Sequence, residues 1–290
     1  MDVSLAGGTQ PIGLRYLEPA IDLRGIVSSY YIFWANLPIV TDLMRADMPQ
    51  IRFMLKGDGC YRFANGHIAT TPEVALVGPT MGASRVNVAG PVMVFGIALL
   101  PAGWAALVRE DASSHADALV DGTAMFRPLL EEVIDAMRCA PNPRVLVSIA
   151  DAAMRALVAK SGDAPLWFTR MTDHWLVATA SPEVDTLVAS AGMSARQVER
   201  LARRVYGAPP KLLARKYRAL RAASLLGSGN LSWQDVAGDA FYDQSHFIRE
   251  VKHFTGLTPR QLLRDPPPVT KLMGQRREMT GHLSELALLS

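Results

Sequence analysis

An internal repeat constrains the fold of this chain more than any other sequence feature. The segment Met193–Arg215 lies 49 residues before the segment Tyr242–Arg264, and the two align without a gap. Matched pairs are Arg200 with Arg249, Arg203 with Lys252, Gly207 with Gly256, Pro210 with Pro259 and Leu213 with Leu262. Apolar positions coincide as well, as in Val198 with Phe247 and Val205 with Phe254. A duplicated helical unit is therefore expected in the C-terminal half.

Each copy carries the start and stop signals of a capped helix. Ser194 and Asp243 are good N-caps, and Ser194 with Gln197 can form a capping box. Gly207 and Gly256 suit a left-handed C-terminal cap, and the proline that follows each suits the first turn of another helix. Short helices are expected before the two copies, at Pro182–Ser190 and Ser232–Asp239. A helix, a tight turn and a second capped helix form a helix-turn-helix unit.

Charge is distributed unevenly along the chain. Residues 1–160 carry 13 Lys and Arg against 15 Asp and Glu, whereas residues 161–265 carry 14 against 10. The span 194–221 alone holds nine basic residues and one acidic residue. Such a cluster can form a surface for a polyanion, although a run of charges more often only keeps a helix face solvated.

The outward faces of the two copies favour DNA binding over a helical hairpin used only for packing. Donor-rich side chains at the N-terminal half of a helix can reach base edges in the major groove. The proposed base readers are Arg196, Gln197, Arg200, Gln244, Ser245, His246 and Arg249. The proposed phosphate contacts, which set register and affinity, are Arg203, Arg204, Lys211, Arg215 and Arg260.

A long helix is expected between the two copies, from about Pro209 to Leu226. It would be roughly 27 Å long at 1.5 Å per residue. A rod of that length can hold two reading helices near the ~34 Å of one DNA turn. One polypeptide would then read two successive major-groove segments without dimerising.

Residues 166–265 resemble the DNA-binding domain of the AraC/XylS family of bacterial transcription regulators. The motifs that carry the resemblance are Gly192-Met193-Ser194, Val198-Glu199-Arg200-Leu201, Ala237, Phe241–Phe247, Phe254–Pro259, and Arg218 with Arg221-Ala222. Two residues depart from the family pattern: Ala240 stands where a glycine is usual, and Val188 where alanine is usual. The first unit is closer to the pattern and more basic, so we expect it to contribute more of the binding energy.

The first hundred residues have the pattern of a β-rich domain. Short segments rich in β-branched and aromatic residues alternate with turn residues, which favours a sandwich or barrel. The expected strands are Ile26–Trp34, Gln50–Leu55, Cys60–Ala64, Val74–Val77, Arg85–Val88 and Val92–Leu99. Gly57-Asp58-Gly59 and Asn65-Gly66 are expected to be hairpin turns. Helical periodicity follows, with expected helices at Trp104–Arg109, Phe126–Met137 and Pro143–Lys160.

The predicted class is α+β, with a β-rich sensor or dimerisation domain over residues 1–160. A linker at 161–165 leads to the double helix-turn-helix domain at 166–265. After Pro266-Pro267-Pro268 the sequence leaves the order of residues 266–290 open.

The N-terminal half also resembles, more loosely, the cupin-like sensor domains that accompany some of these regulators. That resemblance rests on Met48–Phe53, Val77-Gly78-Pro79, Gly90–Gly96 and Pro101-Ala102-Gly103, and it implies a small effector. The aromatic candidates for an effector pocket are Tyr30, Trp34, Phe53, Phe63 and Phe95.

Enzyme chemistry and metal binding are not expected. A metal-binding cupin needs about three converging ligands, and only His67 and His115 are available in this half. Cys60 lacks an obvious base, and two cysteines support no disulfide framework. We predict no catalytic residue, no metal and no cofactor. The alternative is a small-molecule binding protein, or an enzyme-like β-domain, carrying a helical oligomerisation module.

The expected main partner is double-stranded DNA. This domain organisation is also compatible with three further partners: RNA polymerase, a small effector and a second copy of the chain. The sequence shows neither a signal peptide nor a membrane helix, which predicts a cytoplasmic, nucleoid-associated protein.

Overall fold

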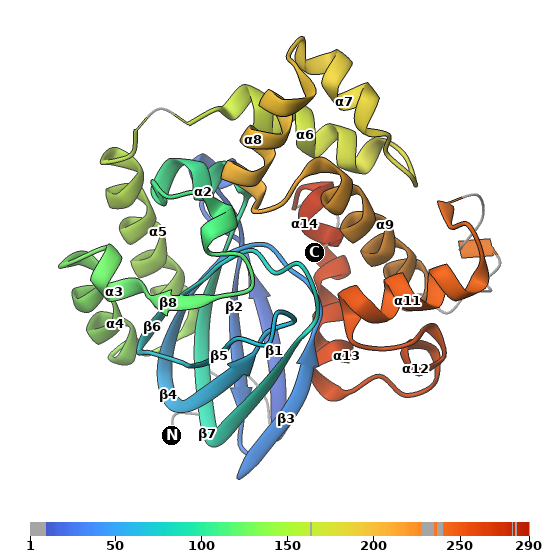
Figure 1. The fold of residues 1–290 in the computed structure, drawn as a ribbon. Coiled ribbons are helices and arrows are strands. Elements are labelled where there is room, and N and C mark those ends of the chain that lie inside the picture. The colour runs from blue at the N-terminus through green and yellow to red at the C-terminus, as the bar shows by residue number, and fades with distance from the viewer. Residues whose placement is uncertain are drawn as a thin grey trace.

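A computed structural model describes residues 10–162, 164–227, 235–236, 240–279, 281 and 283–289. An antiparallel β-domain is followed by a helical region, and the last helices of the chain lie between the two (Figure 1). The predicted α+β class is confirmed.

The β-domain is built on one sheet with the strand order β1-β2-β7-β4-β6-β8, while β3 pairs with β7 and β5 with β4. The strands are β1 (Ile12–Leu17), β2 (Val27–Ala35), β3 (Ile39–Met44), β4 (Gln50–Arg62), β5 (Ile68–Thr70), β6 (Val74–Val77), β7 (Ser84–Leu99) and β8 (Leu119–Asp121). The long strand β7 pairs with β3 along its first part and with β2 along its second. The sheet therefore curves round on itself.

One of the two predicted glycine turns is absent because glycine serves another purpose there. Gly57-Asp58-Gly59 lies inside β4, where the register against β7 shifts on both sides of Lys56. Gly57 has the positive φ of 78° that was expected, but the chain does not reverse. The prediction of a hairpin turn was wrong, because a positive-φ glycine also serves a β-bulge. Asn65-Gly66 does form the turn between β4 and β5.

The two faces of the sheet carry different clusters because side chains alternate along each strand. In β2, Tyr30, Ile32 and Trp34 belong to the core beneath α4 and α5. Tyr31 and Phe33 face the opposite side and line a cavity. The helices of this domain are α2 (Pro101–Leu107), α3 (Gly122–Met125), α4 (Leu129–Arg138) and α5 (Pro143–Ala159), with short 3-10 turns η1 (Ile21–Leu23) and η2 (Ala112–Ser114).

The helical region follows the predicted repeat closely. Its helices are α6 (Leu166–Ala178), α7 (Val184–Ala191), α8 (Ala195–Tyr206), α9 (Pro210–Gly227), α11 (Gln244–Thr255) and α12 (Pro259–Arg264). The long connecting helix expected at Pro209–Leu226 is α9. The short helix expected at Ser232–Asp239 lies outside the described residues except for Asp235 and Val236, which are helical. In the predicted linker 161–165, Asp163 likewise lies outside them.

The C-terminal tail contacts both parts of the molecule. It consists of α13 (Pro268–Gly274), η4 (Gln275–Met279) and α14 (Glu285–Leu289). α13 lies against β1 and β3, whereas α14 lies against α6 and α9. The tail therefore joins the curved sheet to the helical region (Figure 1).

Candidate nucleic-acid interface and ligand cavity

α8 is fixed at both ends as the second helix of a helix-turn-helix unit. Gly192, with φ 60°, ends α7 in the left-handed conformation. The predicted capping box is present: Gln197 Oε1 accepts from the Ser194 N–H at 3.0 Å, and Ser194 Oγ accepts from the Gln197 N–H at 3.4 Å. Gly207, with φ 83°, closes the helix. These two glycines stand where a Cβ would be strained, so the caps define the length of α8.

One face of α8 is anchored and the other is open. Val198, Ala202 and Val205 are buried. The Tyr206 hydroxyl donates to Asp173 Oδ1 on α6 at 2.6 Å, and burial raises the pKa of Asp173 to about 6. The opposite face is exposed and almost entirely basic or amide-bearing; it carries Arg196, Gln197, Arg200, Arg203 and Arg204. The anchored face holds these side chains outward.

α11 repeats this pattern at the positions that the sequence repeat matches. The Asp243 side chain accepts from the His246 N–H at 2.7 Å, and Gly256 ends the helix with φ 79°. The positions that are buried in α8 are also buried in α11, where they hold Phe247, Val251 and Phe254. The repeated sequence therefore makes two helices with the same inner and outer faces.

The reading face of α11 differs from that of α8 in composition. Gln244, Ser245 and Arg249 are exposed. His246 is half-buried, with its ring edge-on to Phe241 at a centroid distance of 5.9 Å. The outer face of α11 therefore presents fewer charges than that of α8.

The proposed phosphate contacts divide into free and engaged side chains. Arg204, Lys211 and Arg260 are exposed. Arg203 Nη2 lies 2.9 Å from Glu199 Oε1 in an exposed pair, which is weak enough to exchange for a phosphate. Arg215 is engaged: its guanidinium holds both carboxylate oxygens of Glu250 at 2.7 and 2.9 Å and so joins α9 to α11.

Three other basic residues of the 194–221 cluster also serve the fold. The buried Lys216 Nζ donates to the Asp47 carbonyl at 2.7 Å. Arg218 lies over the Phe241 ring at 5.2 Å. Arg221 donates to the carbonyls of Leu176 and Val177 at the end of α6. Four of the nine basic residues therefore make contacts within the fold, and five face solvent.

A cavity lies on the concave side of the sheet, with the tail as one wall. Its free volume is ≈ 60 Å³, which corresponds to roughly four to six water molecules. Its apolar walls come from β1, β2, β3, β4, β7 and α13; they are Leu14, Phe33, Val40, Met44, Met54, Val86, Val88, Val94, Val269 and Met273. Its polar side is formed by Tyr16, Tyr31, Asp47, Gln50, Arg52, Tyr61, Thr71 and Arg276.

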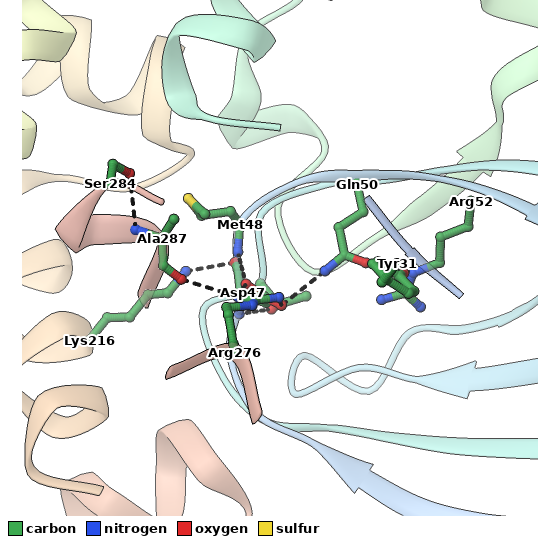
Figure 2. Close-up of polar contacts among 10 residues, drawn as sticks. Tyr31, Asp47, Met48, Gln50, Arg52, Lys216, Arg276, Ser284 and Ala287 are labelled. Atoms are coloured by element: carbon green, nitrogen blue, oxygen red, sulfur yellow. Dashed lines mark hydrogen bonds and ion pairs between the residues drawn. The ribbon is translucent and has the colours of Figure 1, made fainter. Parts of the chain in front are cut away.

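Asp47 is the centre of a buried network at the polar side of the cavity (Figure 2). Its carboxylate accepts from the guanidinium of Arg276 at 3.2 and 3.3 Å, from Gln50 Nε2 at 2.9 Å and from the Met48 N–H at 2.8 Å. Burial is the largest single effect and raises the pKa of Asp47, but the charge and hydrogen bonds of Arg276, the charge of Arg45 and the Met48 N–H together lower it by more, so that pKa lies below its ordinary value. Its carbonyl accepts from Lys216 of α9. One residue therefore touches the cavity, the tail and the helical region.

Comparison with known proteins identifies the helical region. Residues 187–265 match a family model described as "Helix-turn-helix domain", of the AraC type. The C-terminal region is an AraC-type helix-turn-helix domain. The resemblance seen in the sequence is thereby confirmed for residues 187–265, and a domain of this type supports a DNA-binding regulator of transcription. No curated protein sequence matches the chain.

Solved structures with some similarity include two of ToxT from Vibrio cholerae. An apo ToxT variant is 11% identical, with 88% of this chain and 98% of that chain covered and a TM-score of 0.46. ToxT bound to an unsaturated fatty acid is 12% identical, with 87% and 94% covered and a TM-score of 0.46. The AraC-like transcriptional activator CuxR is 14% identical, with 66% and 80% covered and a TM-score of 0.27.

The β-domain holds the C-terminal ends of both capped helices of the AraC-type domain. A Cβ at Gly207 would lie 2.6 Å from Pro79, and one at Gly256 would lie 3.2 Å from Ala83. The Ala83 N–H donates to the His253 carbonyl at 2.9 Å, and the Ala46 N–H donates to the Phe254 carbonyl at 2.7 Å. Because the contacts lie at the C-terminal ends, the N-terminal halves of α8 and α11 stay open.

None of the five aromatic residues predicted to line an effector pocket lines the cavity of this regulator. Tyr30, Trp34, Phe53 and Phe95 are buried beneath α4 and α5, and Phe63 stacks between Tyr61 and His67. The aromatic residues at the cavity are instead Tyr16, Tyr31, Phe33 and Tyr61. Tyr31 and Phe33 are next to the predicted residues Tyr30 and Trp34 in β2, and their side chains point to the opposite face of the sheet. The sequence of β2 does not indicate which face lines the cavity, because both faces carry apolar residues.

The polar residues of the cavity were not predicted at all. Arg52 and Asp47 look like ordinary surface residues in the sequence, and Arg276 falls in the tail. An Arg inside the otherwise apolar run Gln50–Leu55 was the one available signal, because a charge in a buried strand is unusual. Within the described residues, no three His, Cys, Asp or Glu side chains gather as they would around a metal ion. No described helix combines the length and apolarity needed to cross a membrane.

Proposed function

We propose that the chain reads two successive major-groove segments of DNA with α8 and α11. The observation that carries this proposal is the matched pair of open N-terminal halves on two helices that are buried in the same register. α9 joins the two units, and its 18 residues correspond to roughly 27 Å. That length is compatible with reading sites near one turn, ~34 Å, apart.

The proposed base readers on α8 are Arg196, Gln197 and Arg200. The backbone N–H and the side-chain oxygen of Gln197 form the capping box, and the N–H groups of its side-chain amide remain as donors for a base edge. On α11 the proposed readers are Gln244, Ser245 and Arg249, with a lesser role for the half-buried His246.

The proposed phosphate contacts are Arg203, Arg204, Lys211 and Arg260. Their exposed cations would set affinity and register, because phosphate contacts carry no sequence information. Arg215 is better explained as the partner of Glu250, and we assign it no phosphate.

The β-domain cavity is proposed as the site of a small effector that changes DNA affinity. The supporting contacts run from Asp47 to Lys216, and through the Thr80 hydroxyl, which accepts from the Asp47 N–H at 2.7 Å, to the loop that touches both reading units. A ligand that displaces Asp47 or Arg276 would therefore alter how α9 and the caps are held. In the cell, the DNA-bound protein would be associated with the nucleoid.

Footprinting tests the DNA-reading proposal. The intact chain is first used to select sites from a random DNA pool, and hydroxyl-radical protection is then mapped on the selected site. We expect two protected segments about one helical turn apart for each bound chain. Replacing Gln244 and Arg249 by alanine should remove one segment and leave the other. A single protected segment in the unaltered protein would contradict reading by both helices.

A further inference from the structure

The cavity of the β-domain has an excess of positive charge at one end. Among its lining residues, the guanidinium of Arg276 is matched by the carboxylate of Asp47. The guanidinium of Arg52 has no such partner. Its Nε donates to Gln50 Oε1 at 2.9 Å, Nη1 donates to the Tyr61 hydroxyl, and the group lies over the Tyr61 ring. In the described part of the chain, no carboxylate lies within ion-pair distance of Arg52.

Arg52 is buried, with 5% of its surface exposed, so solvent does little to balance its charge. Removing a cation from water without a counter-ion is costly, and buried cations are normally paired. Neutral oxygen acceptors and a tyrosine ring offset part of that cost. The remaining imbalance suits an anion that arrives with a ligand.

The apolar walls of the cavity indicate which chemistry the rest of that ligand has. Opposite the polar residues, the walls are hydrocarbon from valine, leucine, methionine and phenylalanine side chains, such as Val86, Met54 and Met273. A ligand rich in hydroxyl groups, such as a sugar, would lose hydrogen bonds to water along these walls. An amine would meet Arg52 and Arg276 with a charge of the same sign.

We infer that the cavity binds a small apolar molecule with one acidic head group, and that Arg52 pairs with that group. A planar guanidinium accepts a carboxylate in a two-bonded geometry that gives both strength and orientation. Gln50 and Tyr31 lie beside Arg52 and can turn hydrogen-bond donors toward the same head group. The free volume, about four to six waters, fits a carboxylate with a short hydrocarbon chain. This inference rests on the proposed effector function and names its ligand class.

Three probes of equal chain length test the inference on the intact protein: hexanoate, hexanamide and hexylamine. Thermal unfolding and calorimetric titration are recorded for each. Hexanoate should raise the unfolding midpoint by about 2–4 °C near saturation and should bind at least tenfold more tightly than hexanamide. Hexylamine should produce no shift. Equal binding of hexanoate and hexanamide, or no binding of hexanoate, would overturn the inference.

Substitutions at Arg52 separate a ligand anchor from a structural residue. Arg52→Met should abolish the hexanoate response and leave the ligand-free protein at least as stable, because it removes an unmatched buried charge. Arg62→Met, on the exposed side of the same strand, is the matched control and should keep the response. If Arg52→Met does not fold, Arg52→Lys keeps the charge and should bind hexanoate several-fold more weakly than the unaltered protein. A hexanoate response that survives in Arg52→Met, or is unchanged in Arg52→Lys, would assign the acid to another site.

DNA binding by the same preparations distinguishes failure of this inference from failure of the proposed function. If hexanoate does not bind while the selected DNA does, the ligand class is wrong and the reading proposal stands. If hexanoate binds through Arg52 and DNA affinity does not change, the ligand class is supported and the effector role fails.

Discussion

Breaking the buried ion pair between Asp47 and Arg276 should destabilise the protein strongly. The two side chains are 5% and 2% exposed, respectively. In Arg276→Met the Asp47 carboxylate would stay buried with two of its hydrogen bonds, from Met48 and Gln50. Removing one partner of a buried pair costs about 3–5 kcal/mol. Since two hydrogen bonds remain, we expect a loss near the lower end, about 3 kcal/mol.

The loss should depend on pH, with a sign fixed by Asp47. In the unaltered protein burial raises the Asp47 pKa, but Arg276, with smaller effects from Arg45 and the Met48 N–H, lowers it by more in total, so the folded-state pKa lies below its ordinary value. The pair therefore contributes stability at neutral pH, and that contribution disappears as the pH falls through the folded-state pKa. In Arg276→Met, burial should raise the Asp47 pKa instead, so protonation should relieve the penalty as the pH falls through the raised value. The difference between the two proteins should be largest at pH 7 and smaller near pH 4.

Urea unfolding followed by tryptophan fluorescence measures this difference. The control is the double variant Asp47→Asn with Arg276→Met, which leaves no buried charge in the pair and should recover most of the lost stability. An unfolding free energy for Arg276→Met within about 0.5 kcal/mol of the unaltered protein would refute the reasoning. So would an equal loss in the double variant, because the loss would then come from packing and not from charge.

Three further changes test other parts of the structure. Lys211→Ala should weaken binding to all DNA sequences alike and reduce the salt slope by about one; a loss confined to one sequence would contradict a phosphate role. Burial lowers the pKa of Lys216 from its ordinary value of 10.5 to about 8, so the unfolded chain holds the proton longer and stability should rise between pH 8 and 10.5. The urea midpoint of unfolding, measured between pH 8 and 10.5, should rise less in Lys216→Met than in the unaltered protein. The same dependence on pH in both proteins would contradict the lowered pKa of Lys216. Gly207→Ala places a Cβ at φ 83° and 2.6 Å from Pro79, which should cost about 1–2 kcal/mol or more, whereas Gly274→Ala meets open space and should change thermal stability little.

The helical region could be predicted from the sequence because its signals are local. Caps such as Ser194 and Gly207 act within a few residues, so their spacing specifies where α8 begins and ends. The buried positions of α8 and α11 also follow from apolar periodicity alone. For the same reason the connecting helix α9 was expected within one residue of its observed ends.

The cavity could not be predicted because it depends on contacts between distant segments. Arg276 meets Asp47 across 229 residues of sequence, and Lys216 meets the Asp47 carbonyl across 169. The basic cluster illustrates the same limit, since sequence does not distinguish Arg215, which is paired with Glu250, from the exposed Lys211. Partners chosen by tertiary packing decide these roles.

The central claim is that the open face of α8 reads bases, and Arg200 tests it most directly. The affinity of the intact chain for its selected site, and for that site with one base pair changed, is measured for Arg200→Ala and for the control Arg144→Ala. Both arginines are exposed, and Arg144 lies on α5 of the β-domain. Arg200→Ala should lose about five- to 150-fold in affinity, equivalent to about 1–3 kcal/mol, and should discriminate less at one base pair. Unchanged affinity and an unchanged footprint in Arg200→Ala would contradict base reading by α8.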